Sequence, residues 1–320
     1  MHAASIIMLC WAMIGAACLF SGIATPAVVI SLGLLVAVVG VPHGAADHRF
    51  ARSRLEPVVG RAWLAVFAVG YPAIAMVVVL GWVWAPAVTV VLFFIASAWH
   101  FGQEEPRLAI GLRLLRPFTR FARGGLVIWT PIVFQGDEVS RYLGVVALRG
   151  LGPDSQGMLE MAAIWSSIML ATAAVAWSGQ ALTAITAGRS RRRVLLVDNA
   201  MVASLVLLFA VASPVVGFLV YFCGWHSARG LKRLRRELAE SWPQLASSLA
   251  PLSVAAIAGA VLVVCYAFPT ERWNDAVIRA TFLGLSAVAM PHLLLHGVAP
   301  LLATASLRQT YRPAHLRATA

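Results

Sequence analysis

The sequence predicts an all-α integral membrane protein that crosses the bilayer many times. Of its 320 residues, 60% are hydrophobic and only 12% are charged, whereas about a quarter of the residues in soluble proteins are charged. The mean hydropathy is +0.83. Apolar stretches of about 17 to 25 residues, each long enough to span a hydrocarbon core of roughly 30 Å, recur along the chain. These observations exclude a soluble enzyme of ordinary composition.

Apolar runs separated by glycines, prolines and charges predict ten helices. In chain order they span Ser5 to Ile23, Ala27 to Pro42, Ala62 to Val83, Ala85 to His100, Phe121 to Phe134, Met158 to Trp177, Val194 to Ala212, Pro214 to His226, Ser248 to Phe268 and Ala276 to Val298. Several are short, so we expect a bundle of about 8 to 10 transmembrane helices. Residues 1–303 form a single transmembrane domain in this interpretation, and residues 304–320 form a short basic cytoplasmic tail.

Basic residues mark one side of the membrane. If the N-terminus is cytoplasmic, the segments after the second, fourth, sixth, eighth and tenth helices also face the cytoplasm, and they hold 21 of the 25 Lys and Arg residues. Merging the seventh and eighth helices into one helix kinked at Pro214 would break this pattern, which is the positive-inside rule. We therefore expect a multi-pass protein of the cell inner (cytoplasmic) membrane with both termini cytoplasmic. The net charge of +12 then needs no nucleic-acid partner.

Six histidines lie at a similar depth in the membrane, because each is at a helix end on the predicted cytoplasmic side. They are His43 and His48 on the second helix, His100 on the fourth, His226 on the eighth, and His292 and His296 on the tenth. Ionisable residues in membrane spans are costly and tend to mark functional sites, and neutral imidazole is the commonest protein ligand for transition metals. Each histidine alone is better explained as a helix cap, but the set predicts a metal site in the bundle core.

Residues beside these histidines extend the predicted site. Asp47 could orient a metal-binding imidazole by accepting its second N–H, or it could cap the segment that follows. Aromatic residues near the histidines could form either an interfacial belt or the wall of a pocket for a long apolar substrate. The aromatic residues expected in such a pocket are Phe93, Phe94, Trp99, Phe222 and Trp225.

Four segments around the histidines carry a resemblance to a known family. They are Pro42-His43-Gly44-Ala45-Ala46-Asp47-His48, Trp99-His100-Phe101-Gly102, Tyr221-Phe222-Cys223-Gly224-Trp225-His226-Ser227-Ala228-Arg229 and Met290-Pro291-His292. They are similar to the motifs of the Brp/Blh family of β-carotene 15,15'-dioxygenases, which are bacterial and archaeal integral membrane proteins that cleave β-carotene centrally to all-trans-retinal. Each segment is short, but four in this order extend over nearly the whole chain.

The resemblance implies a non-haem Fe(II) held by His43, His100 and His226, with β-carotene or a related carotenoid and O₂ as substrates. It also implies a functional link to a rhodopsin that uses the retinal. One position departs from the family, which commonly carries a further histidine where this chain has Gly230. Either His292, which we include in the predicted metal set, or His296 completes the coordination, or three histidines suffice, or the reaction has been changed or lost.

Other classes of function compete with this interpretation. A membrane desaturase or hydroxylase with two irons needs about eight clustered histidines by family analogy, and six are suitably placed here. A non-catalytic carotenoid-binding or opsin-associated protein gains support from Gly230. A transporter would need acidic or lysine residues inside its spans, where the sequence offers only Asp198 and Glu160.

Overall fold

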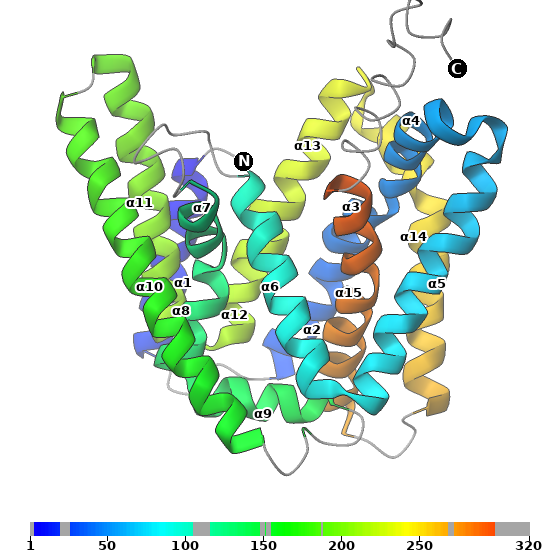
Figure 1. Ribbon diagram of the computed structural model, residues 1–320, viewed down its shortest axis with the longest axis horizontal. Coiled ribbons are helices and arrows are strands. Elements are labelled where there is room, and N and C mark those ends of the chain that lie inside the picture. Colours follow the sequence, from blue (N-terminus) through cyan, green and yellow to red (C-terminus); the bar gives the residue numbers. More distant parts are fainter. Residues whose placement is uncertain are drawn as a thin grey trace, which may run out of the picture.

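The computed structural model is a bundle of helices, which confirms the predicted fold class (Figure 1). The structure describes residues 3–19, 26–104, 116–147, 151, 155–186, 188–267 and 272–297. Within these ranges six helical stretches are long and apolar enough to cross a membrane, and the first helix is a shorter apolar one. The protein is therefore a multi-pass membrane protein. The expected basic tail over residues 304–320 lies outside the described ranges.

The helices follow one another closely along the chain. Their bounds are α1 (Ala3–Leu19), α2 (Pro26–Leu35), the π-helical η1 (Val36–Gly40), α3 (Val41–Ala45), α4 (Asp47–Val59), the short 3₁₀ turn η2 (Gly60–Ala62), α5 (Trp63–Trp84), α6 (Pro86–Glu104), α7 (Arg116–Gly124), α8 (Leu126–Phe134), α9 (Gly136–Val146), α10 (Ser155–Thr186), α11 (Arg189–Val211), α12 (Pro214–Phe218), the π-helical η4 (Leu219–Ser227), α13 (Ala228–Glu237), α14 (Trp242–Ala267) and α15 (Trp273–Gly297).

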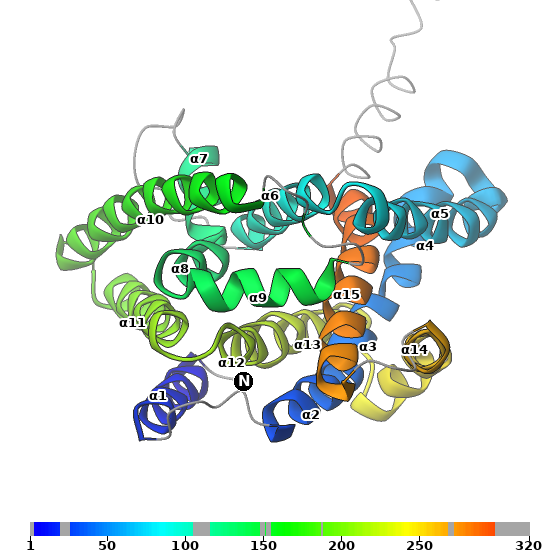
Figure 2. The same ribbon diagram turned by 90° about the horizontal axis from the view of Figure 1, so that it is seen from below.

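The helices pack in three rows when they are viewed along their axes. Helices α10, α6 and α5 form one outer row and α1, α2 and α14 form the other (Figure 2). Helices α8, α9, α12, α13 and α15 lie between them, and α11 joins the rows at one end. The middle row is thus shielded from lipid on both sides. This is where a membrane bundle can hold polar side chains.

The break predicted before Pro214 is confirmed. Helix α11 ends at Val211, the backbone of Ala212 and Ser213 is extended, and Pro214 begins α12. Proline suits the first turn of a helix because the N–H that it lacks has no partner there in any case. The chain reverses direction at this break, so α12, η4 and α13 run back along the bundle.

Several predicted helix boundaries differ from the structure. The helix expected over Phe121 to Phe134 is divided at Gly125 into α7 and α8. The helices expected to stop at Pro42 and His226 continue into α4 and α13 without a break in the helical backbone. Hydropathy marks where apolar side chains end, whereas a helix continues for as long as its backbone hydrogen bonds do. The hydropathy pattern therefore does not predict charged helices such as α13.

Helix α9 has no counterpart among the predicted helices. Asp137 and Glu138 stand in its first turn, where carboxylates interact favourably with the helix dipole, and Val139 and Val146 are buried. It lies across one end of the bundle, nearly at right angles to the long helices (Figure 1). A short amphipathic helix of this kind escapes a search for long apolar spans, and here it closes the lower end of the middle row.

The basic segments gather at the end of the bundle opposite α9. Helices α4, α7 and α13 and the beginning of α11 all lie there (Figure 1). Further inside, Arg123 of α7 and Asp198 of α11 form an ion pair of 3.2 Å with side chains 10% and 11% exposed, and Gln180 of α10 donates a hydrogen bond of 2.8 Å to the same carboxylate. Asp198 thus has a structural partner, which removes the main sequence argument for a transporter.

A backbone contact between glycines positions the end of α6. A Cβ atom added at Gly102 would overlap the carbonyl oxygen of Arg120 and lie 2.8 Å from its carbonyl carbon. A Cβ atom at Gly124 would likewise lie 2.6 Å from Cα of Gly102. Helices α6 and α7 therefore touch backbone to backbone two residues after His100, and only glycine allows this approach.

We expect Gly102→Ala to destabilise the protein by about 1 to 3 kcal/mol, because the added methyl group meets backbone that cannot move aside. Thermal unfolding in detergent should show a lower melting temperature. Gly70→Ala in α5 is the matched control, since nothing lies within 4 Å of a Cβ atom at that position. Equal melting temperatures for the two variants would show that the close contact is not required.

Candidate metal centre

Four histidine rings from four separate helical segments surround one point in the bundle. His43 comes from α3, His100 from α6, His226 from η4 and His292 from α15. Successive ring centroids around the set lie 5.1 Å (His43 to His226), 5.3 Å (His226 to His100), 5.1 Å (His100 to His292) and 5.4 Å (His292 to His43) apart. Imidazoles whose nitrogens lie about 2.1 Å from one shared ion have centroids roughly 4.5 to 5.5 Å apart. The centroid spacing of these four rings is compatible with one shared ion.

Two π-helical segments bring His43 and His226 to this point. The segment η1 ends just before α3, and η4 contains His226 itself. One extra residue in a helical turn rotates every later side chain by about 100° about the helix axis. A histidine that would face lipid in a regular α-helix can thus face the bundle core. No hydropathy pattern reveals such a turn, which is why the sequence predicts uninterrupted helices here.

Asp47 lies behind the ring of histidines and connects three helices. It is 1% exposed, and its Oδ1 accepts a hydrogen bond of 2.7 Å from Nδ1 of His292 in α15. Its Oδ2 accepts a bond of 2.7 Å from the hydroxyl group of Tyr71 in α5, which also lies 3.0 Å from the carbonyl oxygen of Val288. Nε2 of His296 lies 3.5 Å from Oδ1. Both oxygens of the carboxylate therefore accept hydrogen bonds, one from α15 and one from α5.

The carboxylate and its two histidines form a second possible arrangement of metal ligands. Asp47, His292 and His296 each offer one ligand atom, and these atoms lie within 4.8 Å of one another. This buried group could hold a metal ion by itself. His292 belongs to both arrangements, because its Nδ1 faces Asp47 while its ring lies beside those of His43 and His100.

The remaining histidines are not part of the set of four rings. Nδ1 of His48 is 2.7 Å from the carbonyl oxygen of Ala45 on its own helical turn, the capping role that the sequence allowed for any single histidine. The ring of His296 packs on Phe50 with a centroid distance of 4.6 Å. His2 and His315 lie outside the described part of the chain.

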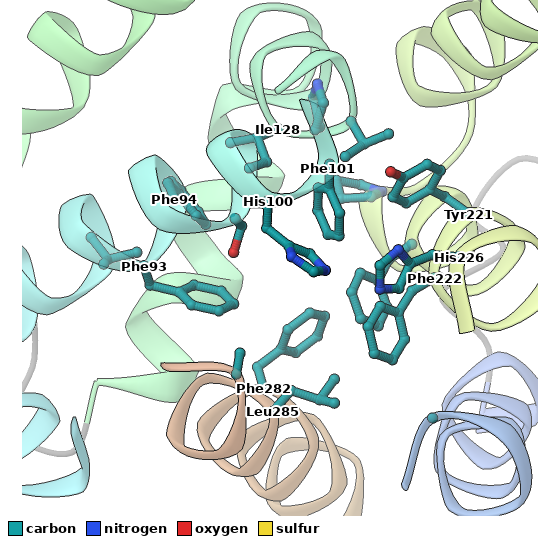
Figure 3. Close-up of a pocket in the computed structure, with 18 of the residues that line it drawn as sticks. Phe93, Phe94, His100, Phe101, Ile128, Tyr221, Phe222, His226, Phe282 and Leu285 are labelled. Atoms are coloured by element: carbon teal, nitrogen blue, oxygen red, sulfur yellow. The ribbon is translucent and has the colours of Figure 1, made fainter. Parts of the chain in front are cut away.

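An apolar cavity of about 210 Å³ opens from the histidines. His43, His100, His226 and His292 line one end of it, and Val90, Tyr142 and Pro214 line parts nearer to α9. Figure 3 shows the rings of His100 and His226 facing each other across the cavity, with aromatic side chains around them. Such a wall, apolar apart from a few converging polar groups, is typical of a site for an apolar ligand.

The cavity contains three of the five aromatic residues named from the sequence. Phe93, Phe94 and Phe222 line it. Trp99 is 49% exposed and Trp225 borders a separate cavity of about 30 Å³, so among the described side chains neither of these contributes to the main wall. Seven further aromatic residues that the sequence does not predict also line it, which are Trp82, Phe101, Tyr142, Phe209, Phe218, Tyr221 and Phe282.

Similarity to known proteins identifies the family of this chain. The family model described as beta-carotene 15,15'-dioxygenase matches residues 34–298, which include all four histidines. The chain belongs to this family. It is therefore an enzyme of the oxidoreductase class, and family membership takes the place of the desaturase and transporter interpretations.

Two relatives support the assignment over most of the chain. The beta-carotene 15,15'-dioxygenase of uncultured marine bacterium 66A03 is 27% identical over 274 residues, covering 82% of this chain and 90% of that protein. A protein of Halobacterium salinarum described as probable beta-carotene 15,15'-dioxygenase Blh is 29% identical over 282 residues, covering 80% of this chain and 79% of the relative. No solved structure matches the chain.

Tyr71 is a partner of Asp47 that the sequence does not predict. It stands among apolar residues of α5, 24 positions from Asp47, and only the packing of α5 against α4 and α15 brings its hydroxyl group to the carboxylate. The available indication was a lone tyrosine, followed by Pro72, inside an otherwise apolar span. The hydrogen bond to the buried Asp47 explains why a tyrosine stands in this apolar helix.

We expect Asp47→Asn to weaken metal binding by about 10- to 100-fold, because the neutral amide no longer fixes the tautomer and orientation of His292. Equilibrium dialysis of the purified protein against Co(II) would measure this. Tyr71→Phe is the matched control, since it keeps the carboxylate and removes one of its hydrogen bonds, and its effect should be smaller. Wild-type affinity in Asp47→Asn would contradict the orienting role.

Proposed function

We propose that this protein cleaves β-carotene at its central 15,15' double bond with O₂, using one non-haem Fe(II) held by His43, His100, His226 and His292. The observation that supports this proposal most strongly is the closed set of four imidazoles at the end of an apolar cavity, in a chain of the β-carotene 15,15'-dioxygenase family. In this reaction one carbon–carbon double bond is broken. The two oxygen atoms of O₂ become the carbonyl oxygens of two molecules of all-trans-retinal, so no further reductant is needed.

The hydrogen bond between Asp47 and His292 favours the four-histidine arrangement over the group of Asp47, His292 and His296. A distance of 2.7 Å between Oδ1 and Nδ1 is that of a hydrogen bond with a proton between the two atoms. Two ligands of one ion hold no such proton. A metal-binding histidine usually donates its other N–H to a carboxylate in this way, which leaves Nε2 of His292 for the ion.

Four imidazoles can bind iron, and among the metals that they can bind, the proposed reaction requires one that is redox-active. Imidazole binds zinc, copper, iron and nickel, but oxidative cleavage by O₂ requires a metal that can change its oxidation state. Iron supplies this electron chemistry, which no side chain can provide. The protein contributes neutral ligands and a dry surrounding wall, and Asp47 keeps the proton of His292 on Nδ1.

The length of the cavity supports a carotenoid as the substrate. His100 and Val90 both line it and lie ten residues apart in α6, and His292 and Phe282 lie ten residues apart in α15. Ten residues of α-helix extend about 15 Å. A carotenoid is about as long as the hydrocarbon core is thick, roughly 30 Å, so one half of it fits between the histidines and α9. The central bond would then lie at the histidines, and this orientation requires the other half to leave the cavity beside them.

The same proposal includes a location and a partner. Because the basic segments gather at the end of the bundle that holds α4 and α13, we assign this end to the cytoplasm and the protein to the inner membrane, with both termini cytoplasmic. The retinal product would leave directly into lipid. A rhodopsin in the same membrane is the partner that would use it.

Expression in carotene-producing cells tests the activity. We expect β-carotene to fall and retinal to accumulate, and the purified protein to contain one iron per chain by elemental analysis. Bound carotene that stays intact, with no retinal, would instead indicate a carotenoid-binding protein. Two irons per chain would contradict the single-ion site.

A pair of histidine variants tests the ligand set. We expect His292→Ala to lose most of the bound iron and the retinal production, while His296→Ala keeps one iron per chain, because only the former removes a ring of the central set. Elemental analysis of both purified variants measures the difference. Loss of the iron in His296→Ala as well would assign the ion to the group of Asp47, His292 and His296.

A bulky residue deep in the cavity tests whether the depth of the cavity places the central bond of the substrate at the histidines. Val90 is 3% exposed and lines the cavity, whereas its neighbour Val91 is 42% exposed. We expect Val90→Phe to block the ring end of the substrate, so that the rate of retinal formation falls at least tenfold or longer apocarotenals appear on chromatography. Val91→Phe is the control and should behave as the wild type. Unchanged products and rate in Val90→Phe would contradict the assigned orientation of the substrate.

A further inference from the structure

Gly230 stands where the family resemblance implies a further histidine, and the structure places it against the proposed ligand His43. Gly230 is the third residue of α13, four positions after His226. A Cβ atom added at Gly230 would overlap Cε1 of His43 and lie 2.6 Å from Nδ1 and 3.4 Å from Nε2. The imidazole therefore occupies the space that any side chain at position 230 would need.

The ring of His43 lies between two other imidazoles and the backbone of α13. Its ring contacts His226 at a centroid distance of 5.1 Å and His292 at 5.4 Å, and the edge formed by Nδ1 and Cε1 faces the backbone of α13. A ring pushed away from α13 would move toward these two imidazoles or into the cavity that His43 lines, and in either case out of its present place in the set. The position of His43 in the set thus depends on the missing side chain at Gly230.

We propose that Gly230 is a positioning residue for His43, and that a side chain at position 230 and the His43 ring exclude one another in this chain. The inference rests on the proposed function for the role of His43, but the steric part stands on the packing alone. The glycine is then no sign of a lost ligand. A histidine at this position would compete with His43 for the same space instead of adding a further ligand.

A double-mutant cycle in the metal-free protein tests the packing. With EDTA present, Gly230→Ala should lower the melting temperature in the wild-type background, and His43→Ala should restore stability by removing the ring that the new methyl group meets. The matched control is Gly224→Ala in η4, where the nearest atom to an added Cβ is Cδ1 of Ile6 at an ordinary 3.6 Å. Equal destabilisation by Gly230→Ala in both backgrounds, or none in either, would overturn the packing.

Metal affinity tests the positioning. We expect Gly230→Ala to weaken Co(II) binding in equilibrium dialysis at least tenfold, Gly224→Ala to change it less than twofold, and Gly230→Ala to add no further loss once His43 is alanine. Gly230→His should also bind more weakly than the wild type, and tighter binding would refute the exclusion of the two side chains. If His43→Ala alone bound Co(II) normally, the proposed ligand set would fail, while the EDTA cycle would still decide the steric claim.

Discussion

The site is organised around one buried carboxylate. Asp47 is almost fully buried in an apolar bundle, where an unpaired charge would cost several kcal/mol. Its two oxygens are instead held by His292 from α15 and Tyr71 from α5. Because Asp47 begins α4, directly after His43 and the turn of α3, these hydrogen bonds connect three helices at the depth of the histidines. The orientation of His292, and with it the shape of the whole set of rings, depends on this connection.

Irregular backbone and missing side chains bring the other histidines to the same place. The π-helical turns η1 and η4 rotate His43 and His226 toward the core. Gly102 lets α6 meet α7 just after His100, and Gly230 leaves room for the ring of His43. The two π-helical turns depart from regular helix geometry, and such departures are frequent at functional sites.

The position of the cavity relates the chemistry to the membrane. Its wall is formed by helices of the middle row together with α6 of one outer row, and the outer rows face lipid, so we expect an apolar substrate to enter from the membrane (Figure 2). The histidines lie at one end of this cavity and α9 closes the bundle at the other. An apolar polyene has no charged group, so its binding needs no charged residue in the wall. Burial of apolar surface, worth about 25 cal/mol per Å², is enough to hold a polyene.

Hydropathy and charge alone determined the class of the protein. Apolar length revealed the membrane helices, the distribution of arginines predicted the break before Pro214, and the placement of histidines at helix ends on one side indicated a shared site. These properties can be read locally because lipid selects each span separately. Helix α9 and the charged parts of α4 and α13 were missed, since none of them is long and apolar.

Only the tertiary structure decided which residues meet. It brought Tyr71 to Asp47, placed Phe282 in the cavity wall while leaving Trp99 at the surface, and showed that His43 fills the space beside Gly230. Such contacts join segments up to 245 residues apart, as in the bond between Asp47 and His292. They depend on helix rotation and on how closely two backbones approach. Neither is determined by local sequence, because a single π-helical turn or one missing methyl group changes both.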